Sequence, residues 1–393
     1  MKVLFVTASL GLGGSEKCMA EMIRHIDLER YDVTVLALTQ VENQHHFDKR
    51  IRIINGYPVF ERLQMPMRLF IVEALKKGEI GLLVCKSKYW IRSKIGNWHI
   101  SKYFWQELSK YILPYDEKFD VVIGYGQGPA SYFAIDKVPN VKKRVLWLNT
   151  DLEKAKYDIN YIRRFYMSAD VVTADSKNGK DNLLRLYPEI RNRVYCYPNM
   201  LDVDGIVKKS KEYAVAYLQD GAAHILTVGR MAEAKALHLA VGAAEILKCR
   251  GIPFNWYIIG DGSLRGQLEE QIRRAGVEDC VVLLGAQTNP YPWFKACDIY
   301  VQTSVYEGSC MTINEAMIFN KPVVTTNFPA AYEKIQDGKN GLICEMNASS
   351  IADKIEQLLS DKALCKEMAD YICQNQAKWE SDMQLFYDMI END

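Results

Sequence analysis

"MKVLFVTASLGLGG", Met1 to Gly14, contains one lysine, then a short apolar run, and then a turn rich in glycine. The run is too short for a secretory signal peptide, so it predicts a buried first strand. The residues after the glycines have the pattern of a helix. A continuous apolar strand followed by a turn and a helix is typical of a parallel α/β sheet.

The same unit recurs along the chain. Each apolar run is followed by turn residues and a segment with helical periodicity. The later runs are "DVTVLAL", "DVVIGYG", "RVLWLNT", "DVVTADS", "RVYCYPN", "HILTVGR", "NWYIIGD", "CVVLLGA", "DIYVQTS", "KPVVTTN" and "GLICEM". Strands that are apolar throughout indicate parallel sheets buried on both faces. Two series of such units predict two Rossmann-like domains.

Proline, asparagine, aspartate and glycine cluster between the two series, where the strand pattern lapses. We therefore expect an N-terminal domain at 1–205 and a C-terminal domain at 206–375. The last segment, 376–393, should form an amphipathic helix, because four apolar residues follow helical spacing: Trp379, Met383, Phe386 and Ile390.

The composition of the chain limits the classes of partner it can have. The chain has 393 residues, and its 49 basic and 49 acidic residues balance, so the net charge gives no argument for a nucleic-acid partner. The ten cysteines include no CxxC pair, and no histidine stands at metal-ligand spacing. This pattern predicts reduced thiols in a cytoplasmic protein and no metal site.

One stretch, from Arg62 to Lys110, departs from this balance. It carries ten basic residues and three acidic ones, with tryptophan and tyrosine interleaved. That mixture suits contact with anionic lipid headgroups, peripherally on the inner face of a membrane. The alternative is an ordinary solvated helical pair whose aromatic side chains face the core.

Gly11, Gly13 and Gly14 stand between the first strand and its helix. A helix start offers unpaired amides and a positive dipole end, which favours an anion such as phosphate. The dinucleotide fingerprint would require a glycine where Glu16 stands, so a nicotinamide cofactor is disfavoured. The alternative is a tight turn that needs glycine for packing alone.

Arg230 and Lys235 follow the strand "HILTV" and precede a helix. Arginine supplies a planar fork of donors and lysine a point charge, a useful pair for a diphosphate. Their position at the carboxyl end of a strand is where ligands bind in open α/β sheets.

"SVYEGSCMTINEAM", Ser304 to Met317, holds two glutamates around small residues and a helix start. If the helix start meets a diphosphate, neither carboxylate can lie on it without repulsion. Each carboxylate would instead accept from a diol, and a nucleotide-sugar has diols on both sides of its diphosphate. Glu315 would then hold the ribose and Glu307 the transferred sugar. The alternative makes both ordinary surface residues.

Together, "GLGGSEK", "VGRMAEAK", "IIGDGSLRGQLE" and "YEGSCMTINEA" followed by "KPVV" resemble the retaining glycosyltransferases of family 4, including their Glu-x7-Glu motif. The resemblance implies a GT-B fold, in which two Rossmann-like domains face a deep cleft and the final helix crosses back onto the N-terminal domain. It also implies that the N-terminal domain binds the acceptor and the C-terminal domain the nucleotide-sugar.

Carried over by position, the resemblance assigns the diphosphate to Arg230 and Lys235, and the approach of the first-domain loop to Gly13 and Gly14. It assigns the donor sugar to Glu307 and the ribose to Glu315. The backbone beside the sugar would be that of Gly308, Ser309, Cys310 and Met311.

The sequence departs from the family pattern at two places. Ala236 follows Lys235 where the family often has glycine, which suggests a slightly different turn. Asn149 stands in "VLWLNTDLEKAKYD" at what looks like a family histidine. Asparagine can hydrogen-bond but carries no proton at neutral pH, so Asp151 or Glu153 would act as a base. In a retaining, front-face reaction the leaving diphosphate can itself take the proton.

The expected activity is hexosyl transfer from a nucleoside diphosphate sugar to a glycan hydroxyl. A UDP-sugar is favoured over a GDP-sugar, with no cofactor and no metal. The acceptor would be a lipid-linked oligosaccharide in bacterial capsule or exopolysaccharide synthesis. The alternatives are a sugar-nucleotide 2-epimerase of the same fold and a donor-binding pseudoenzyme subunit.

Overall fold

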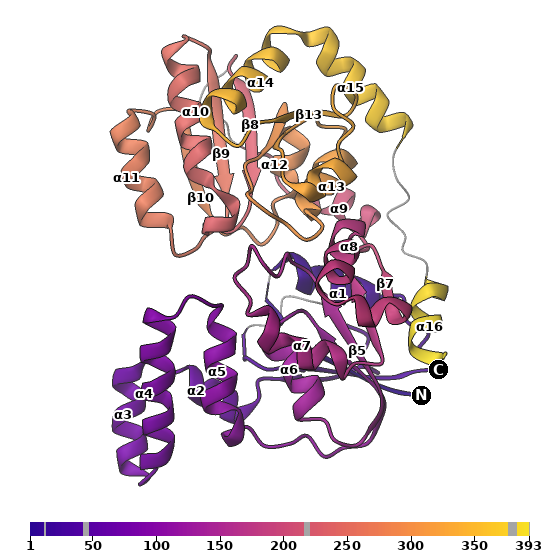
Figure 1. Ribbon diagram of the computed structural model, residues 1–393. Helices are drawn as coiled ribbons and strands as arrows, with labels where there is room; N and C mark the ends of the chain where they lie inside the picture. Colours follow the sequence, from indigo (N-terminus) through magenta and orange to yellow (C-terminus); the bar gives the residue numbers. More distant parts are fainter. Residues whose placement is uncertain (12, 42–46, 216–220, 376–382, 393) are drawn as a thin grey trace. The chain divides into compact units, whose positions relative to one another are not determined.

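The computed structural model describes residues 1–11, 13–41, 47–215, 221–375 and 383–392. The chain divides into two compact units, Met1–Leu201 with Glu380–Asp393, and Asp202–Trp379. Each unit is built on one parallel sheet with helices on its faces (Figure 1). The α/β class predicted from the apolar runs is therefore confirmed.

The first unit has a seven-stranded sheet. In spatial order its strands are β3 (Arg52–Asn55), β2 (Asp32–Ala37), β1 (Lys2–Thr7), β4 (Phe119–Tyr125), β5 (Val141–Leu148), β6 (Val171–Ala174) and β7 (Val194–Cys196). Its helices are α1 (Gly14–Arg24), α2 (Pro58–Gln64), α3 (Met67–Lys76), α4 (Ile80–Ile95), α5 (Ile100–Leu108), α6 (Pro129–Asp136), α7 (Ile159–Met167), α8 (Lys177–Leu186) and α16 (Met383–Glu391).

The second unit has a six-stranded sheet. Its spatial order is β10 (Val281–Gly285), β9 (Phe254–Ile259), β8 (Ala223–Val228), β11 (Ile299–Gln302), β12 (Val323–Thr326) and β13 (Gly341–Cys344). Its helices are α9 (Val203–Lys209), α10 (Leu237–Cys249), α11 (Arg265–Ala275), α12 (Tyr291–Ala296), α13 (Met311–Ile318), α14 (Ala348–Ser360) and α15 (Lys362–Gln374).

Both strand orders reverse direction once, between β1 and β4 in the first unit and between β8 and β11 in the second. In open parallel sheets the carboxyl ends of the two strands at such a reversal form the usual ligand crevice. The ends of β8 and β11 are therefore the first place to look for a site in the second unit.

Every apolar run picked out from the sequence forms a strand, and one strand was missed. The missed strand, β3, lies at the sheet edge, and β2 is its one partner among the strands of the described residues. Its four residues are exposed or half-buried. An edge strand of this kind needs no continuous apolar run, so the pattern that found the other strands did not find it.

Helix α16 packs on the first unit. Phe386, Met389 and Ile390 are buried in the core that covers one face of the sheet. The Tyr387 ring stacks on Tyr31 with ring centroids 5.1 Å apart. The helix predicted from the apolar spacing is confirmed in this region, whereas Trp379 lies outside the described residues.

Helices α2 to α5 form a group inserted between β3 and β4. Inside it, the Lys86 ammonium of α4 is buried and donates to the carbonyl oxygens of Leu63 (2.8 Å) and Met65 (2.6 Å). The ammonium thereby satisfies free carbonyls at the end of α2. Burial, aided by the Arg62 charge, lowers the pKa of Lys86 to about 8.

The aromatic residues of this helical group are split between core and surface. Tyr103, Phe104 and Trp105 on α5 are buried, while Trp90 and Trp98 are about half exposed, at 49% and 46%. Neither of the two readings of the stretch from 62 to 110 therefore describes all of its aromatic side chains. No helix within the described residues is long and apolar enough to cross a membrane.

Candidate functional site

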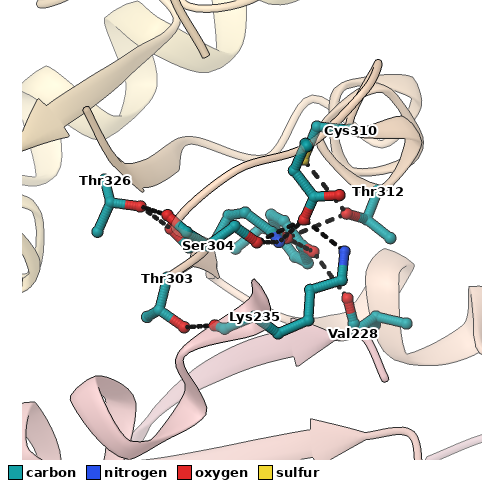
Figure 2. Close-up of polar contacts among 10 residues, drawn as sticks. Val228, Lys235, Thr303, Ser304, Cys310, Thr312 and Thr326 are labelled. Atoms are coloured by element: carbon teal, nitrogen blue, oxygen red, sulfur yellow. Dashed lines mark hydrogen bonds and ion pairs between the residues drawn. The ribbon is translucent and has the colours of Figure 1, made fainter. Parts of the chain in front are cut away.

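A polar cluster lies at the reversal point of the second sheet. Strand β11 ends at Gln302, and the polar residues Thr303 and Ser304 follow it directly. All three are buried. Figure 2 shows Thr303 and Ser304 beside Lys235, which comes from the loop after β8, with the Thr303 hydroxyl donating to the Lys235 carbonyl. The cluster thus joins the two strand ends where a ligand crevice is expected.

Glu307 is the centre of this cluster. Its Oε1 accepts hydrogen bonds from Lys235 Nζ (2.5 Å), Ser304 Oγ (2.5 Å) and Gln302 Nε2 (3.2 Å). No donor among the described residues reaches its Oε2. One oxygen of the carboxylate is therefore anchored, and the other remains able to accept from a ligand.

Gln302 is fixed from its other side. Its Oε1 accepts from Tyr300 Oη (2.6 Å) and Thr312 Oγ1 (3.0 Å), so its amide nitrogen must face Ser304 and Glu307. Tyr300 is fully buried, which raises its pKa well above the ordinary value and keeps it a hydroxyl donor. This connected network holds the Glu307 carboxylate in one orientation.

Lys235 is mostly buried, with 19% of its side chain exposed. Burial alone would lower its pKa, but the Glu307 carboxylate outweighs burial and raises the pKa above the ordinary value. The ammonium is therefore charged at neutral pH. The sequence predicted that Lys235 and Glu307 meet different parts of one ligand; in the structure the two side chains form an ion pair.

The loop that carries Lys235 is held at two further points. Thr303 Oγ1 donates to the Lys235 carbonyl (2.7 Å), and the Val305 amide donates to the Ala234 carbonyl (2.8 Å). Ala236 adopts a left-handed conformation, with φ 42° and ψ 42°. That is the conformation glycine favours, so Ala236 adopts a turn that glycine would make with less strain.

Arg230 lies in the same loop and is exposed. Its position is set by the segment after β9, because the Met231 amide donates to the Asp261 carbonyl (2.9 Å). Gly260 and Gly262 allow this approach: both have positive φ, and a Cβ at either would lie within 2.4 Å of a carbonyl oxygen of the Arg230 loop. Arg230 and Lys235 therefore come from one braced loop beside the cluster.

The start of α13 is formed by Gly308, Ser309, Cys310 and Met311. Cys310 precedes the helix with φ 45° and ψ 63°, a left-handed conformation that costs an ordinary residue about 1–2 kcal/mol. Burial and the nearby Glu307 raise the pKa of the Cys310 thiol to about 12. The thiol is therefore neutral and is a poor nucleophile.

Glu315 lies inside α13 and is 6% exposed, so it is no ordinary surface residue. Its Oε1 accepts from the Tyr291 hydroxyl at 3.1 Å. Tyr291 is the first residue of α12. Burying a charged carboxylate costs folding free energy, so its burial favours a role in binding a ligand over that of a surface residue.

Gln302, Ser304 and Tyr291 are the positioning residues that the sequence reading missed. The first two could have been found, since polar residues at the carboxyl end of an apolar strand mark a site in a parallel sheet. Tyr291 could not, because its partner Glu315 is 24 residues away and only the fold brings the two together.

The remaining predicted residues lie in the first unit. Gly13 precedes α1, which begins at Gly14. Glu16 in the first turn of α1 accepts from the hydroxyls of Ser15 (2.8 Å) and Ser9 (3.2 Å). The helix start therefore already has a carboxylate nearby, which opposes an added anion unless Glu16 moves.

Asn149 follows β5, and its backbone amide donates to Gln127 Oε1 at 3.2 Å. Its side-chain Oδ1 is buried and has no hydrogen-bond partner among the described residues. A buried acceptor without a donor is costly, and a ligand hydroxyl would satisfy it.

The two acids proposed as a base near Asn149 are both engaged. Asp151 Oδ1 accepts from the amides of Glu153 and Lys154, each at 3.0 Å, so it stabilises the following turn. The Glu153 carboxylate pairs with Arg185. Both carboxylates therefore already have partners within the protein, whereas the Asn149 Oδ1 atom has none among the described residues. In the described part of the chain, no three His, Cys, Asp or Glu side chains are grouped so as to hold a metal.

Two units, each built on a parallel sheet with one reversal of strand order, define a two-domain protein of the α/β class. Across 99% of this chain and 98% of the other, the fold is similar to that of Anabaena HepE in complex with UDP-glucose, with a TM-score of 0.70 and 18% identity. The chain has the GT-B fold, as the sequence resemblance implied.

Residues 210–375 match the model of the family Glycosyl transferases group 1. The chain is 28% identical over 207 residues to the N-acetylgalactosamine-N,N'-diacetylbacillosaminyl-diphospho-undecaprenol 4-alpha-N-acetylgalactosaminyltransferase of Campylobacter jejuni. It is 26% identical over 235 residues to an uncharacterised glycosyltransferase of Methanocaldococcus jannaschii. These matches cover 52% and 56% of this chain, and 55% of each relative. The chain thus spans about half the length of these two relatives, and the family match lies within its second unit.

Proposed function

We propose that the protein is a retaining, metal-independent glycosyltransferase. It would move a hexose from a nucleoside diphosphate sugar, with UDP favoured, to a glycan hydroxyl. The observation that carries the proposal is the Glu307 carboxylate, whose Oε1 is anchored by Lys235, Ser304 and Gln302 while Oε2 has no donor among the described residues. A fixed acceptor beside a buried ammonium suits a sugar joined to a diphosphate.

In this proposal the diphosphate lies on Lys235, Arg230 and the amides at the start of α13. Charge develops on the leaving diphosphate as the bond to the sugar breaks, and preorganised donors stabilise that charge. Glu307 Oε2 accepts from a sugar hydroxyl and holds the ring. Glu315, held by Tyr291, accepts from the ribose diol. Cationic side chains thereby take the part that a metal plays in other transferases.

The reaction would proceed on one face of the sugar. The bond from the anomeric carbon to the diphosphate oxygen breaks as the acceptor oxygen forms its bond from the same side. The acceptor proton passes to the departing diphosphate oxygen, so no dedicated protein base is needed. This agrees with the engagement of Asp151 and Glu153 in other contacts. Asn149 would then contribute a hydrogen bond and no proton transfer.

The acceptor is proposed to be a lipid-linked oligosaccharide, as in bacterial capsule or exopolysaccharide assembly. Support comes from the Campylobacter relative, whose name describes transfer to a diphospho-undecaprenol-linked sugar. Such an enzyme would act from the cytoplasm at the inner face of the membrane.

The test is product analysis with a panel of UDP- and GDP-sugars and a lipid-linked acceptor. We expect release of the nucleoside diphosphate and a product whose anomeric configuration is that of the donor. An inverted product would contradict the retaining mechanism. Conversion of the donor to its epimer without acceptor would establish the 2-epimerase alternative. Donor binding without turnover on any acceptor would establish the pseudoenzyme alternative.

A further inference from the structure

Exposed apolar side chains gather on one part of the first unit. Of the fifteen large hydrophobic residues that are exposed in the described chain, eleven lie between Leu69 and Ile100. They belong to α3, to α4, to the link after α4 and to the first residue of α5. The eleven are Leu69, Ile71, Val72, Leu75, Ile80, Val84, Trp90, Ile91, Ile95, Trp98 and Ile100.

On α4 these residues form a stripe. Ile80, Val84, Ile91 and Ile95 repeat at helical spacing and are 61%, 47%, 50% and 75% exposed. The opposite side of α4 is buried through residues such as Leu82. A helix at the surface of a soluble domain normally has one apolar side, whereas α4 has two.

Helix α3 repeats the arrangement beside it. Phe70 and Ala74 are buried, while Leu69, Val72 and Leu75 are at least half exposed. In Figure 1, α3 and α4 lie side by side at the outer side of the helical group, with α4 between α3 and α5. We call the exposed side of α3 and α4 the hairpin face. Apolar surface of this extent marks an interaction site.

The charged residues of the hairpin that have no ion pair with a described residue are all basic. Each of its acids is paired: Glu73 with Arg62 (2.9 Å) and Lys77 (2.7 Å), and Glu79 with Arg62. Four exposed basic residues have no ion pair with any described residue: Arg68, Lys76, Lys88 and Lys94. The apolar stripe therefore has unpaired basic residues beside it, while both acidic residues of the hairpin are already ion-paired.

We propose that the hairpin face binds the surface of an anionic lipid bilayer, with α4 lying in the plane of the headgroups. The apolar stripe would enter the boundary of the acyl chains, and Lys88 and Lys94 would meet the headgroups. Trp90 and Trp98 are partly exposed, as tryptophans at membrane interfaces are.

Charge decides between a membrane and a second copy of the chain. A twofold dimer through this face would bring the same basic residues together with no free acid opposite them. An anionic bilayer supplies the missing charge. The inference is independent of the proposed transferase activity, although a lipid-linked acceptor would be met at the same surface.

The test is flotation of the full chain with vesicles in the absence of donor and acceptor. With vesicles containing phosphatidylglycerol we expect binding at least tenfold stronger than with phosphatidylcholine alone. The variant Val84→Gln/Ile91→Gln/Ile95→Gln should lose at least tenfold. Lys88→Gln/Lys94→Gln should lose roughly fivefold for each charge removed, with the loss shrinking as salt is raised.

The matched control is Tyr332→Gln, because Tyr332 is 61% exposed and lies in the second unit. It should bind vesicles like the wild type. Tryptophan fluorescence gives a second measurement: vesicles should shift the wild-type emission to the blue, and Trp90→Phe/Trp98→Phe should remove most of that shift. Equal binding to neutral and anionic vesicles would overturn the proposal. The proposal would also be overturned if the protein bound no vesicles and instead formed a dimer that the Val84→Gln/Ile91→Gln/Ile95→Gln variant dissociates.

Discussion

Replacing Glu307 by glutamine tests the physics of the site most sharply. The change keeps the shape of the side chain and removes the charge opposite Lys235. The pair is neither fully buried nor on the surface, with 19% and 14% of the two side chains exposed. Breaking a buried pair costs 3–5 kcal/mol and breaking a surface pair 0–1 kcal/mol, so we expect a loss of about 2–3 kcal/mol. For a unit of this size that lowers Tm by about 5–10 °C.

The same change should strengthen the binding of UDP alone. Lys235 is then released from its partner, and a negative charge near the diphosphate is gone. At about 6 Å and an effective dielectric constant of about 40, that charge is worth about 1.4 kcal/mol, or a tenfold lower Kd. Turnover should fall at least a hundredfold, because the sugar loses its fixed acceptor.

Thermal melts and calorimetric titration measure both effects. Glu278→Gln is the matched control, since Glu278 is an exposed glutamate of the second unit. It should leave Tm, UDP affinity and turnover unchanged. If Glu307→Gln weakened UDP alone as much as a UDP-sugar, Glu307 would be a nucleotide ligand and the sugar assignment would be wrong.

Three further predictions follow from other contacts. Glu315→Gln should weaken the binding of UDP about tenfold, because it removes a charged acceptor worth about 1.5 kcal/mol. Tyr291→Phe should weaken UDP binding by less. Unchanged UDP affinity in Glu315→Gln would rule out the ribose role. Phe386→Ala should destabilise the first unit by about 3–5 kcal/mol, because the ring is fully buried against the sheet; a chemical-denaturation loss below 1 kcal/mol would show that α16 is not docked. The pKa of Lys86 is about 8 in the folded protein, below its unfolded value, so its contribution to the free energy of unfolding should rise as the pH rises from about 8 to 10. Lys86→Met should remove this rise, measured by chemical denaturation at several pH values. A rise that persists in the variant would contradict the assignment.

The sequence alone predicted the sheets well and the contacts within the site poorly. Buried parallel strands announce themselves as apolar runs, and for that reason β3, an edge strand with a half-buried pattern, was overlooked. The positions of Lys235 and Glu307 at two strand ends were also readable, since parallel strands bring their carboxyl ends to one edge.

The pairing of Lys235 with Glu307 was not readable. A sequence pattern indicates which residues lie near a crevice. The partner that each side chain contacts depends on distances in three dimensions. The same holds for Lys86, which was counted as a surface charge and is buried over the end of α2. Lys86 is therefore not one of the exposed basic residues beside the hairpin face.

In the proposed reaction, Lys235 of the second unit binds the diphosphate of a nucleotide-sugar. Calorimetric titration of wild type and Lys235→Met with a panel of nucleotide-sugars tests it most directly. We predict that at least one member, a UDP-sugar first, binds the wild type and that Lys235→Met weakens it by about a hundredfold, or about 2.7 kcal/mol. Equal affinity in the two proteins, or no binding of any nucleotide-sugar to the wild type, would contradict the account.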